Sequence, residues 1–197
     1  MGADSTAGAM VSRSPCFTAR LAGVFYLLNI LTALPAYFGG REHPALAFAF
    51  GHFATVCYVA VTILFYYLFR PVSGSLSLVA ALFSLAGSAL GTLSLYGVTP
   101  FHINTLVFFG FYCVLLGYLI LRSTFLPRIL GGLIVIAGFG WLTFVSRPLA
   151  AAVAPVNYWA GGIAEGSLTL WLLFVGVNAG RWKQQAGLGL GNLPKAR

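Results

Sequence analysis

The sequence predicts an all-α protein, a polytopic integral membrane bundle of six transmembrane helices. Six apolar stretches of roughly 18 to 26 residues fill the chain, and about 20 helical residues cross a hydrocarbon core of about 30 Å. Hydrophobic residues make up 59% of the 197 residues and charged residues only 7%, with a mean hydropathy of +0.92. A soluble domain uses about a quarter of its residues as charges, so this composition excludes a water-facing surface.

The six predicted spans follow one another with short connections. They cover residues 21–38, 44–69, 75–96, 103–121, 129–146 and 156–180. Helices are expected because the alternation of apolar and polar residues that marks a membrane barrel is absent. Pro35 falls late in the first span and should kink or end it. The predicted organisation is an N-terminal cytoplasmic tail over 1–19, a membrane domain over 20–181 and a C-terminal cytoplasmic tail over 182–197.

Positive charge predicts the orientation of the spans in a cell membrane. With both termini in the cytoplasm, two of the eleven Lys and Arg residues, Arg41 and Arg147, lie outside. The other nine lie inside: Arg13, Arg20, Arg70, Arg122, Arg128, Arg181, Lys183, Lys195 and Arg197. These charges are dispersed among span ends, so the net charge of +8 indicates orientation and not a nucleic-acid partner.

Cysteines and glycines point to packing. Cys16, Cys57 and Cys113 are spread over the tail and two spans, a pattern that predicts no metal site, disulfide framework or cofactor. Small residues let helices approach closely in lipid, and we expect them to pack one bundle, with the oligomeric state left open. The glycines concerned are Gly87, Gly91, Gly162, Gly166, Gly176 and Gly180 in GxxxG pairs, and Gly131, Gly132, Gly138 and Gly140 in the fifth span.

Several strings of the chain resemble a known family. They are Phe108-Phe109-Gly110-Phe111, Gly117-Tyr118-Leu119-Ile120, Phe125-Leu126-Pro127-Arg128-Ile129-Leu130-Gly131, Tyr67-Leu68-Phe69-Arg70-Pro71-Val72 and Glu165-Gly166-Ser167-Leu168. They are similar to a family of bacterial integral membrane proteins described as a domain of unknown function (family 4386). The resemblance runs from about residue 20 to 180 and implies six spans and an unassigned function.

Glu165 is the acidic residue that falls inside a predicted span. It lies about nine residues beyond the outer start of the sixth span, roughly 13 Å deep. An ionisable group at that depth costs about 2.5 kcal/mol or more unless it is neutralised, paired or hydrated. Gly161, Gly162 and Thr169 share its helical face, so we expect Glu165 to face protein. Both a packing role and a functional role remain open.

His52 is expected at the same level as Glu165. It lies about eight residues beyond the outer start of the second span, roughly 12 Å deep, which predicts a hydrogen bond or a shared proton with Glu165, within about 6 Å. Further ligand-binding candidates on the outer half are Arg147, Asn104 and His102. Asn29, near the middle of the first span, is a candidate too, although its simpler interpretation is a hydrogen bond that joins two helices.

Two functional classes fit these residues. The favoured one is a non-enzymatic membrane protein that handles a small apolar or lipid-like ligand in an outer-half pocket formed by the candidate residues. The alternative is a membrane enzyme in which Glu165 and His52 perform acid–base chemistry on a lipophilic substrate, as an isomerase or cyclase. A structural subunit without a ligand is the third possibility. The sequence shows no nucleophile–base–orienter set, and it specifies neither the ligand nor catalysis or transport.

Overall fold

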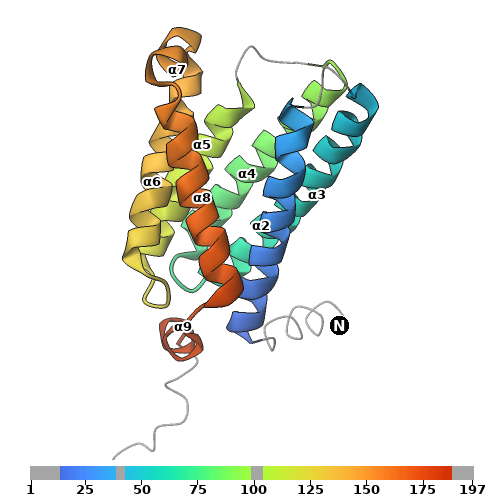
Figure 1. Ribbon diagram of the computed structural model, residues 1–197. Helices are drawn as coiled ribbons and strands as arrows, with labels where there is room; N and C mark the ends of the chain where they lie inside the picture. Colours follow the sequence, from blue (N-terminus) through green and yellow to red (C-terminus); the bar gives the residue numbers. More distant parts are fainter. Residues whose placement is uncertain (1–13, 39–42, 99–103, 188–197) are drawn as a thin grey trace, which may run out of the picture.

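Six long helices lie side by side and run the length of the molecule (Figure 1). The computed structural model describes residues 14–38, 43–98 and 104–187. The long helices are α2 (Pro15–Phe38), α3 (Pro44–Phe69), α4 (Gly74–Leu95), α5 (Thr105–Arg122), α6 (Arg128–Leu142) and α8 (Val156–Phe174). Shorter elements are the 3-10 turn η2 (Thr143–Val145), α7 (Arg147–Val153) and α9 (Ala179–Gln185). Within the described residues there is no strand.

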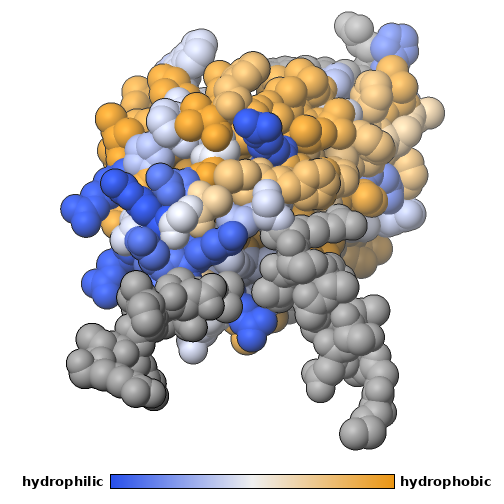
Figure 2. Space-filling model, turned by 90° about the horizontal axis from the view of Figure 1, so that it is seen from below, coloured by the Kyte–Doolittle hydropathy of each residue, from blue (hydrophilic) through white to orange (hydrophobic). Residues whose placement is uncertain are grey.

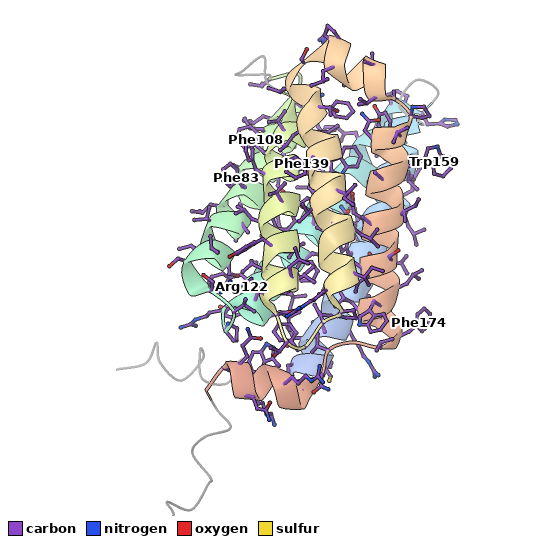
Figure 3. The ribbon with its side chains drawn as sticks, turned by 90° about the vertical axis from the view of Figure 1, so that its left-hand side faces the viewer. Phe83, Phe108, Arg122, Phe139, Trp159 and Phe174 are labelled. Atoms are coloured by element: carbon purple, nitrogen blue, oxygen red, sulfur yellow. The ribbon has the colours of Figure 1, made fainter. Side chains whose placement is uncertain are left out.

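The helices have the length and composition of membrane spans. Five of them, α2 to α5 and α6 with η2, are long and apolar enough to cross a membrane, and α8 with α9 makes up to six. Their outer faces carry large apolar side chains: Phe139, Trp159 and Phe174 are 60, 69 and 76% exposed (Figure 3). Exposed apolar surface of this extent is explained by contact with lipid. The predicted fold class, a helical multi-pass membrane protein, is confirmed.

The helices are arranged as a closed ring. Each long helix packs against the next along the chain from α2 to α6, α8 packs against α6, and α8 returns to α2. Side chains that point inward from all six helices therefore meet in the middle of the ring. This arrangement matters for function because residues far apart in sequence, such as Tyr26 on α2 and Glu165 on α8, become neighbours.

The ends of two helices differ from the predicted spans. Helix α2 begins at Pro15, before the predicted start at residue 21, and continues through Pro35 to Phe38. The last span ends at Phe174 instead of residue 180, because Gly176 adopts a φ of +75° and the Asn178 side chain caps a new helix, α9. Helix α9 is bent by 104° from α8. The predicted start of the C-terminal tail at residue 182 falls inside α9.

The closest helix approach joins α5 and α6 at four glycines. A Cβ on Gly117 would lie 2.7 Å from the Gly131 carbonyl oxygen, and a Cβ on Gly138 would lie 3.0 Å from that of Gly110. The predicted close packing in the fifth span is confirmed at Gly131 and Gly138, and a Cβ on Gly87 would lie 3.1 Å from the Phe108 Cβ on α5. The GxxxG positions Gly91, Gly162 and Gly166 differ from the prediction, because a Cβ there would meet nothing within 4 Å. Their spacing is right for close packing, but these positions face outward.

Both described ends of the chain lie at the same end of the bundle (Figure 1). The Cys16 thiol donates a hydrogen bond to the Val177 carbonyl, 3.0 Å away, and so ties the start of α2 to the segment after α8. We call this the α9 end and the opposite one, where α7 lies, the α7 end.

We expect the α9 end to face the cytoplasm, as the charge distribution predicts. In a Cys16→Ser background, a membrane-impermeant thiol reagent added to intact cells should label Ala152→Cys, which is exposed on α7, and should not label Ser5→Cys. Permeabilised cells provide the control in which both react. The reverse labelling pattern would contradict the predicted orientation.

Candidate functional site

The Glu165 carboxyl lies inside the ring, halfway along α8, between two neutral hydrogen-bond donors. The Tyr26 hydroxyl on α2 donates to Oε2 at 3.1 Å, and the Trp141 indole N–H on α6 donates to Oε1 at 3.2 Å. A carboxylate has room for about four hydrogen bonds. Within the described residues Glu165 accepts these two hydrogen bonds, so acceptor positions remain for a further donor.

Gly161 makes room for the Trp141 indole. It lies one turn before Glu165 on α8, and a Cβ at this position would overlap the indole ring, 2.8 Å from Cε2. The absence of a side chain at Gly161 thus lets the ring approach α8 closely while its N–H donates to the carboxyl. The glycine is required by this close approach rather than by backbone conformation.

Aromatic rings connect the two donors of Glu165 around the inside of the ring. Tyr26 contacts Tyr58 on α3 with ring centroids 6.4 Å apart, Tyr58 contacts Phe109 on α5 at 5.7 Å, and Phe109 contacts Trp141 at 5.8 Å. Four aromatic rings from four helices and one carboxyl therefore form a closed circuit. Aromatic faces attract cations, and the carboxyl at the same level carries a negative charge when it is ionised.

Buried hydroxyl groups without hydrogen-bond partners lie in the same part of the bundle. The Tyr112 and Thr169 hydroxyls have no partner among the described residues, although these side chains are only 2 and 1% exposed. The buried Tyr58 hydroxyl also lacks a hydrogen bond of good geometry and neighbours Ser84. Each unsatisfied buried group costs about 1–3 kcal/mol, so this arrangement suits a polar occupant.

Two of these hydroxyls belong to residues close to Glu165 or to its aromatic circuit. Thr169 lies one turn beyond Glu165 on the same face of α8, and the Tyr112 ring contacts the Tyr58 ring with centroids 6.0 Å apart. A cavity of about 10 Å³ between α3, α4 and α5 borders Tyr112 and has room for about one water molecule. Within the described residues, no three His, Cys, Asp or Glu side chains come together to hold a metal ion.

His52 does not join Glu165, and this prediction was wrong. Its ring nitrogens contact the Phe48 carbonyl at 2.9 Å and the Tyr96 hydroxyl at 3.1 Å. On α3, the residue at the same level as Glu165 is Tyr58, because the Tyr58 ring contacts Tyr26, which is hydrogen-bonded to Glu165. His52 lies six residues nearer the α7 end than Tyr58, roughly 9 Å away along the helix axis. Depth counted from the span starts failed because α3 has 26 residues and α8 has 19.

The other candidate residues are not gathered around Glu165. Asn104 accepts a hydrogen bond from the Leu106 amide, 3.0 Å away, and so caps α5. The Asn29 amide donates to the Ala54 carbonyl at 2.9 Å, which confirms its interpretation as a link between α2 and α3. Arg147 is exposed at the start of α7, and His102 lies outside the described residues. A ligand contact at any of these four stays a prediction.

The sequence did contain a signal for the partners of Glu165. The chain has nine tyrosines, and most of them lie near span ends, where aromatic residues form interfacial belts. Tyr58 and Tyr112 lie in the middle of predicted spans, and Tyr26 lies five residues beyond the predicted start of the first span. All three are found near Glu165 in the structure. Trp141 has no such signal, because the fifth span alone does not show which way its indole points.

The fold and the site together define a polytopic helical membrane protein with a carboxyl group in the middle of its bundle. Residues 99–176, a stretch that includes α5, α6, α7 and α8, match the family described as "Domain of unknown function (DUF4386)". The family resemblance predicted from the sequence is thereby confirmed over this stretch, which includes Trp141 and Glu165.

One relative is similar over part of its length. It is an "Uncharacterized protein" of Archaeoglobus fulgidus, 39% identical over 90 residues, an alignment that covers 43% of this chain and 56% of the relative. The chain therefore matches little more than half of that protein. No solved structure matches the chain. The bacterial origin implied by the family resemblance stays a prediction.

Proposed function

We propose that this protein is a ligand-handling integral membrane protein that binds a small, largely apolar molecule carrying an ammonium group at Glu165. The observation that carries the proposal is a carboxyl with unfilled acceptor positions, in the middle of the bundle, beside buried hydroxyls that lack partners. The ligand contacts expected are the Glu165 oxygens for the ammonium group and the rings of Tyr26, Tyr58, Phe109 and Trp141 for the apolar body.

The charge of the ligand follows from the partners of Glu165. Its two hydrogen-bond donors are neutral, and it is the one acidic side chain of the described residues. An ionised carboxyl at this depth is stabilised by an opposite charge. An organic ammonium ion supplies that charge, fills the open acceptor positions and is attracted by the surrounding aromatic faces. The expected site therefore lies in the middle of the bundle and not in its outer half.

Acid–base catalysis has less support. The enzymatic alternative required Glu165 and His52 in one site, and the hydrogen bonds of His52 tie it to Phe48 and Tyr96 instead. Glu165 has partners suited to holding a carboxyl in place rather than to a second proton-transfer group. Binding is therefore the function that these contacts support best.

Glu165→Gln tests the proposal. Glutamine keeps a donor and an acceptor in nearly the same volume but removes the charge, so the fold should survive and cation binding should be lost. Phenethylamine should raise the unfolding temperature of the wild-type protein in mild detergent, and its neutral analogue 2-phenylethanol should raise it much less. In the Gln variant the phenethylamine effect should disappear. Mass spectrometry should also find less co-purified small molecule in this variant, by about tenfold or more, as expected for a charge-assisted contact.

A matched control is Ser167→Ala, two residues away on another face of α8, which should bind like the wild type. Equal stabilisation of wild type and Glu165→Gln by the amine would contradict a role of the carboxyl charge. A response to neither probe, with no co-purified molecule, would leave Glu165 as a packing residue and the proposal wrong.

A further inference from the structure

A hollow of about 800 Å³, lined by both polar and apolar side chains, opens at the α9 end of the bundle, away from the Glu165 site. Its walls are the loop over residues 123–127, the first residue of α6 and one side of α9. Two arginines, Arg128 and Arg181, line it together with Thr124, Gln184 and Gln185. The hollow thus combines two cationic groups with hydrogen-bonding side chains.

Hydrogen bonds hold the two walls of the hollow together. The Gln185 side-chain oxygen accepts from the Thr124 amide at 3.0 Å and from the Thr124 hydroxyl at 3.1 Å. The Arg181 guanidinium donates through Nη1 to the Thr124 carbonyl at 3.4 Å. A guanidinium has five N–H donors, so this bond orients Arg181 and leaves donors for an anion.

Helix α9 itself is fixed across the end of the bundle. The Trp182 indole N–H donates to the Leu68 carbonyl on α3 at 2.8 Å, and the backbone N–H of Asn178 donates to the Phe125 carbonyl at 3.2 Å. Both bonds connect α9 to segments more than fifty residues away in the sequence. Arg181 is therefore carried by a held helix rather than by a free tail.

Positive charge at this end has no acidic partner within the described residues. Their one acidic side chain, Glu165, lies in the middle of the bundle. Six exposed basic side chains lie at the α9 end: Arg20, Arg70, Arg122, Arg128, Arg181 and Lys183. Figure 2, which looks at this end, shows hydrophilic side chains gathered on one side of the face. An anionic partner complements such a surface.

We propose that the hollow binds the phosphate headgroup of an anionic phospholipid from the leaflet at the α9 end. The planar fork of Arg181 matches the geometry of phosphate oxygens, and basic pockets at the end of a membrane helix bundle are suited to lipid headgroups. The neighbouring surface favours a lipid over a free anion: Ile129, next to Arg128, is 72% exposed and offers an apolar surface to an acyl chain.

Native mass spectrometry of the full chain in detergent tests this inference. Dioleoyl phosphatidylglycerol should bind more tightly than dioleoyl phosphatidylcholine, which has the same acyl chains. Arg181→Gln should weaken phosphatidylglycerol binding about fivefold, the loss expected for one basic contact near the membrane surface. Arg181→Lys keeps the positive charge but lacks the planar guanidinium, so its affinity for phosphatidylglycerol should lie between those of the wild type and Arg181→Gln. Thermal unfolding without added lipid checks the fold, and Arg128→Gln replaces Arg181→Gln if that variant does not fold.

Arg70→Gln is the matched control, because Arg70 is exposed at the same end but does not line the hollow. Its affinity for phosphatidylglycerol should stay within about twofold of that of the wild type, a smaller loss than the one expected for a direct contact. Equal losses for Arg70→Gln and Arg181→Gln would overturn the proposal in favour of diffuse surface charge. Equal binding of the two lipids, or full displacement of phosphatidylglycerol by millimolar inorganic phosphate, would overturn it as well.

Discussion

Gly131→Ala should lower the free energy of unfolding by about 2–3 kcal/mol, at the upper end of the cost of overpacking. A Cβ there would lie 2.8 Å from the Gly117 carbonyl oxygen and 2.9 Å from the Leu121 amide nitrogen. Backbone atoms cannot rotate away as a side chain can, so α5 and α6 would have to separate. That separation would also loosen the contacts of buried neighbours such as Leu130 and Ile134, which are 5 and 0% exposed.

Gly132→Ala is the control, one residue further along the same helix. A Cβ at Gly132 would meet nothing within 4 Å, so this variant should match the wild type or be slightly more stable, because alanine favours a helix over glycine. Reversible unfolding in detergent measures both variants. Equal stability of the two variants would show that α5 and α6 are not in close contact at Gly131.

Gly161→Ala should disrupt the Glu165 site and destabilise the protein by about 2 kcal/mol. The new Cβ would overlap the Trp141 ring and push the indole away from α8. The Glu165 Oε1 would then lose its 3.2 Å hydrogen bond from Trp141, and hydrogen bonds to charged groups contribute about 1.5–3 kcal/mol. We expect a lower unfolding temperature, a changed near-ultraviolet circular dichroism signal and weaker phenethylamine binding.

Two comparisons identify the cause of the Gly161→Ala effect. Gly162→Ala adds the same methyl group one residue away, where a Cβ would meet nothing within 4 Å, and should behave like the wild type. Trp141→Phe removes the N–H donor without overlap and should weaken phenethylamine binding to a similar extent. If Gly161→Ala kept the unfolding temperature and amine binding of the wild type, the proposed role of Gly161 would be wrong.

The structure corrects predictions that depended on how helices face one another. GxxxG spacing at Gly162 and Gly166 predicted close contacts that do not form, whereas the contact predicted at Gly131 does form, with Gly117, which is not part of a GxxxG pair. Spacing along one helix shows which residues share a face, but not whether that face meets protein or lipid. In a membrane span both surroundings are apolar, so hydrophobicity does not distinguish them.

The candidate site was predictable in part. Glu165 stood out because a carboxyl in a span is costly, and its inward direction followed from Gly161 and Thr169 on its face, although Gly162 faces outward. Its partners Tyr26 and Trp141 lie on other helices and are 139 and 24 residues away from Glu165 along the chain. His52 was assigned to the wrong neighbour because the lengths of α3 and α8 differ, so equal distances from their starts do not mean equal depth.

The sequence by itself determined that the chain is a helical membrane protein, approximately where its spans lie and which carboxyl enters them. These features follow from composition and run length, since a bilayer accepts only long apolar segments whose backbone groups are satisfied internally. The tertiary structure decided the rest: the ring order of the helices, the glycine contact between α5 and α6, the aromatic circuit around Glu165 and the position of α9 across the bundle. Each depends on contacts between distant segments, and in lipid those contacts are set by shape and hydrogen bonding, which a hydrophobic pattern does not record.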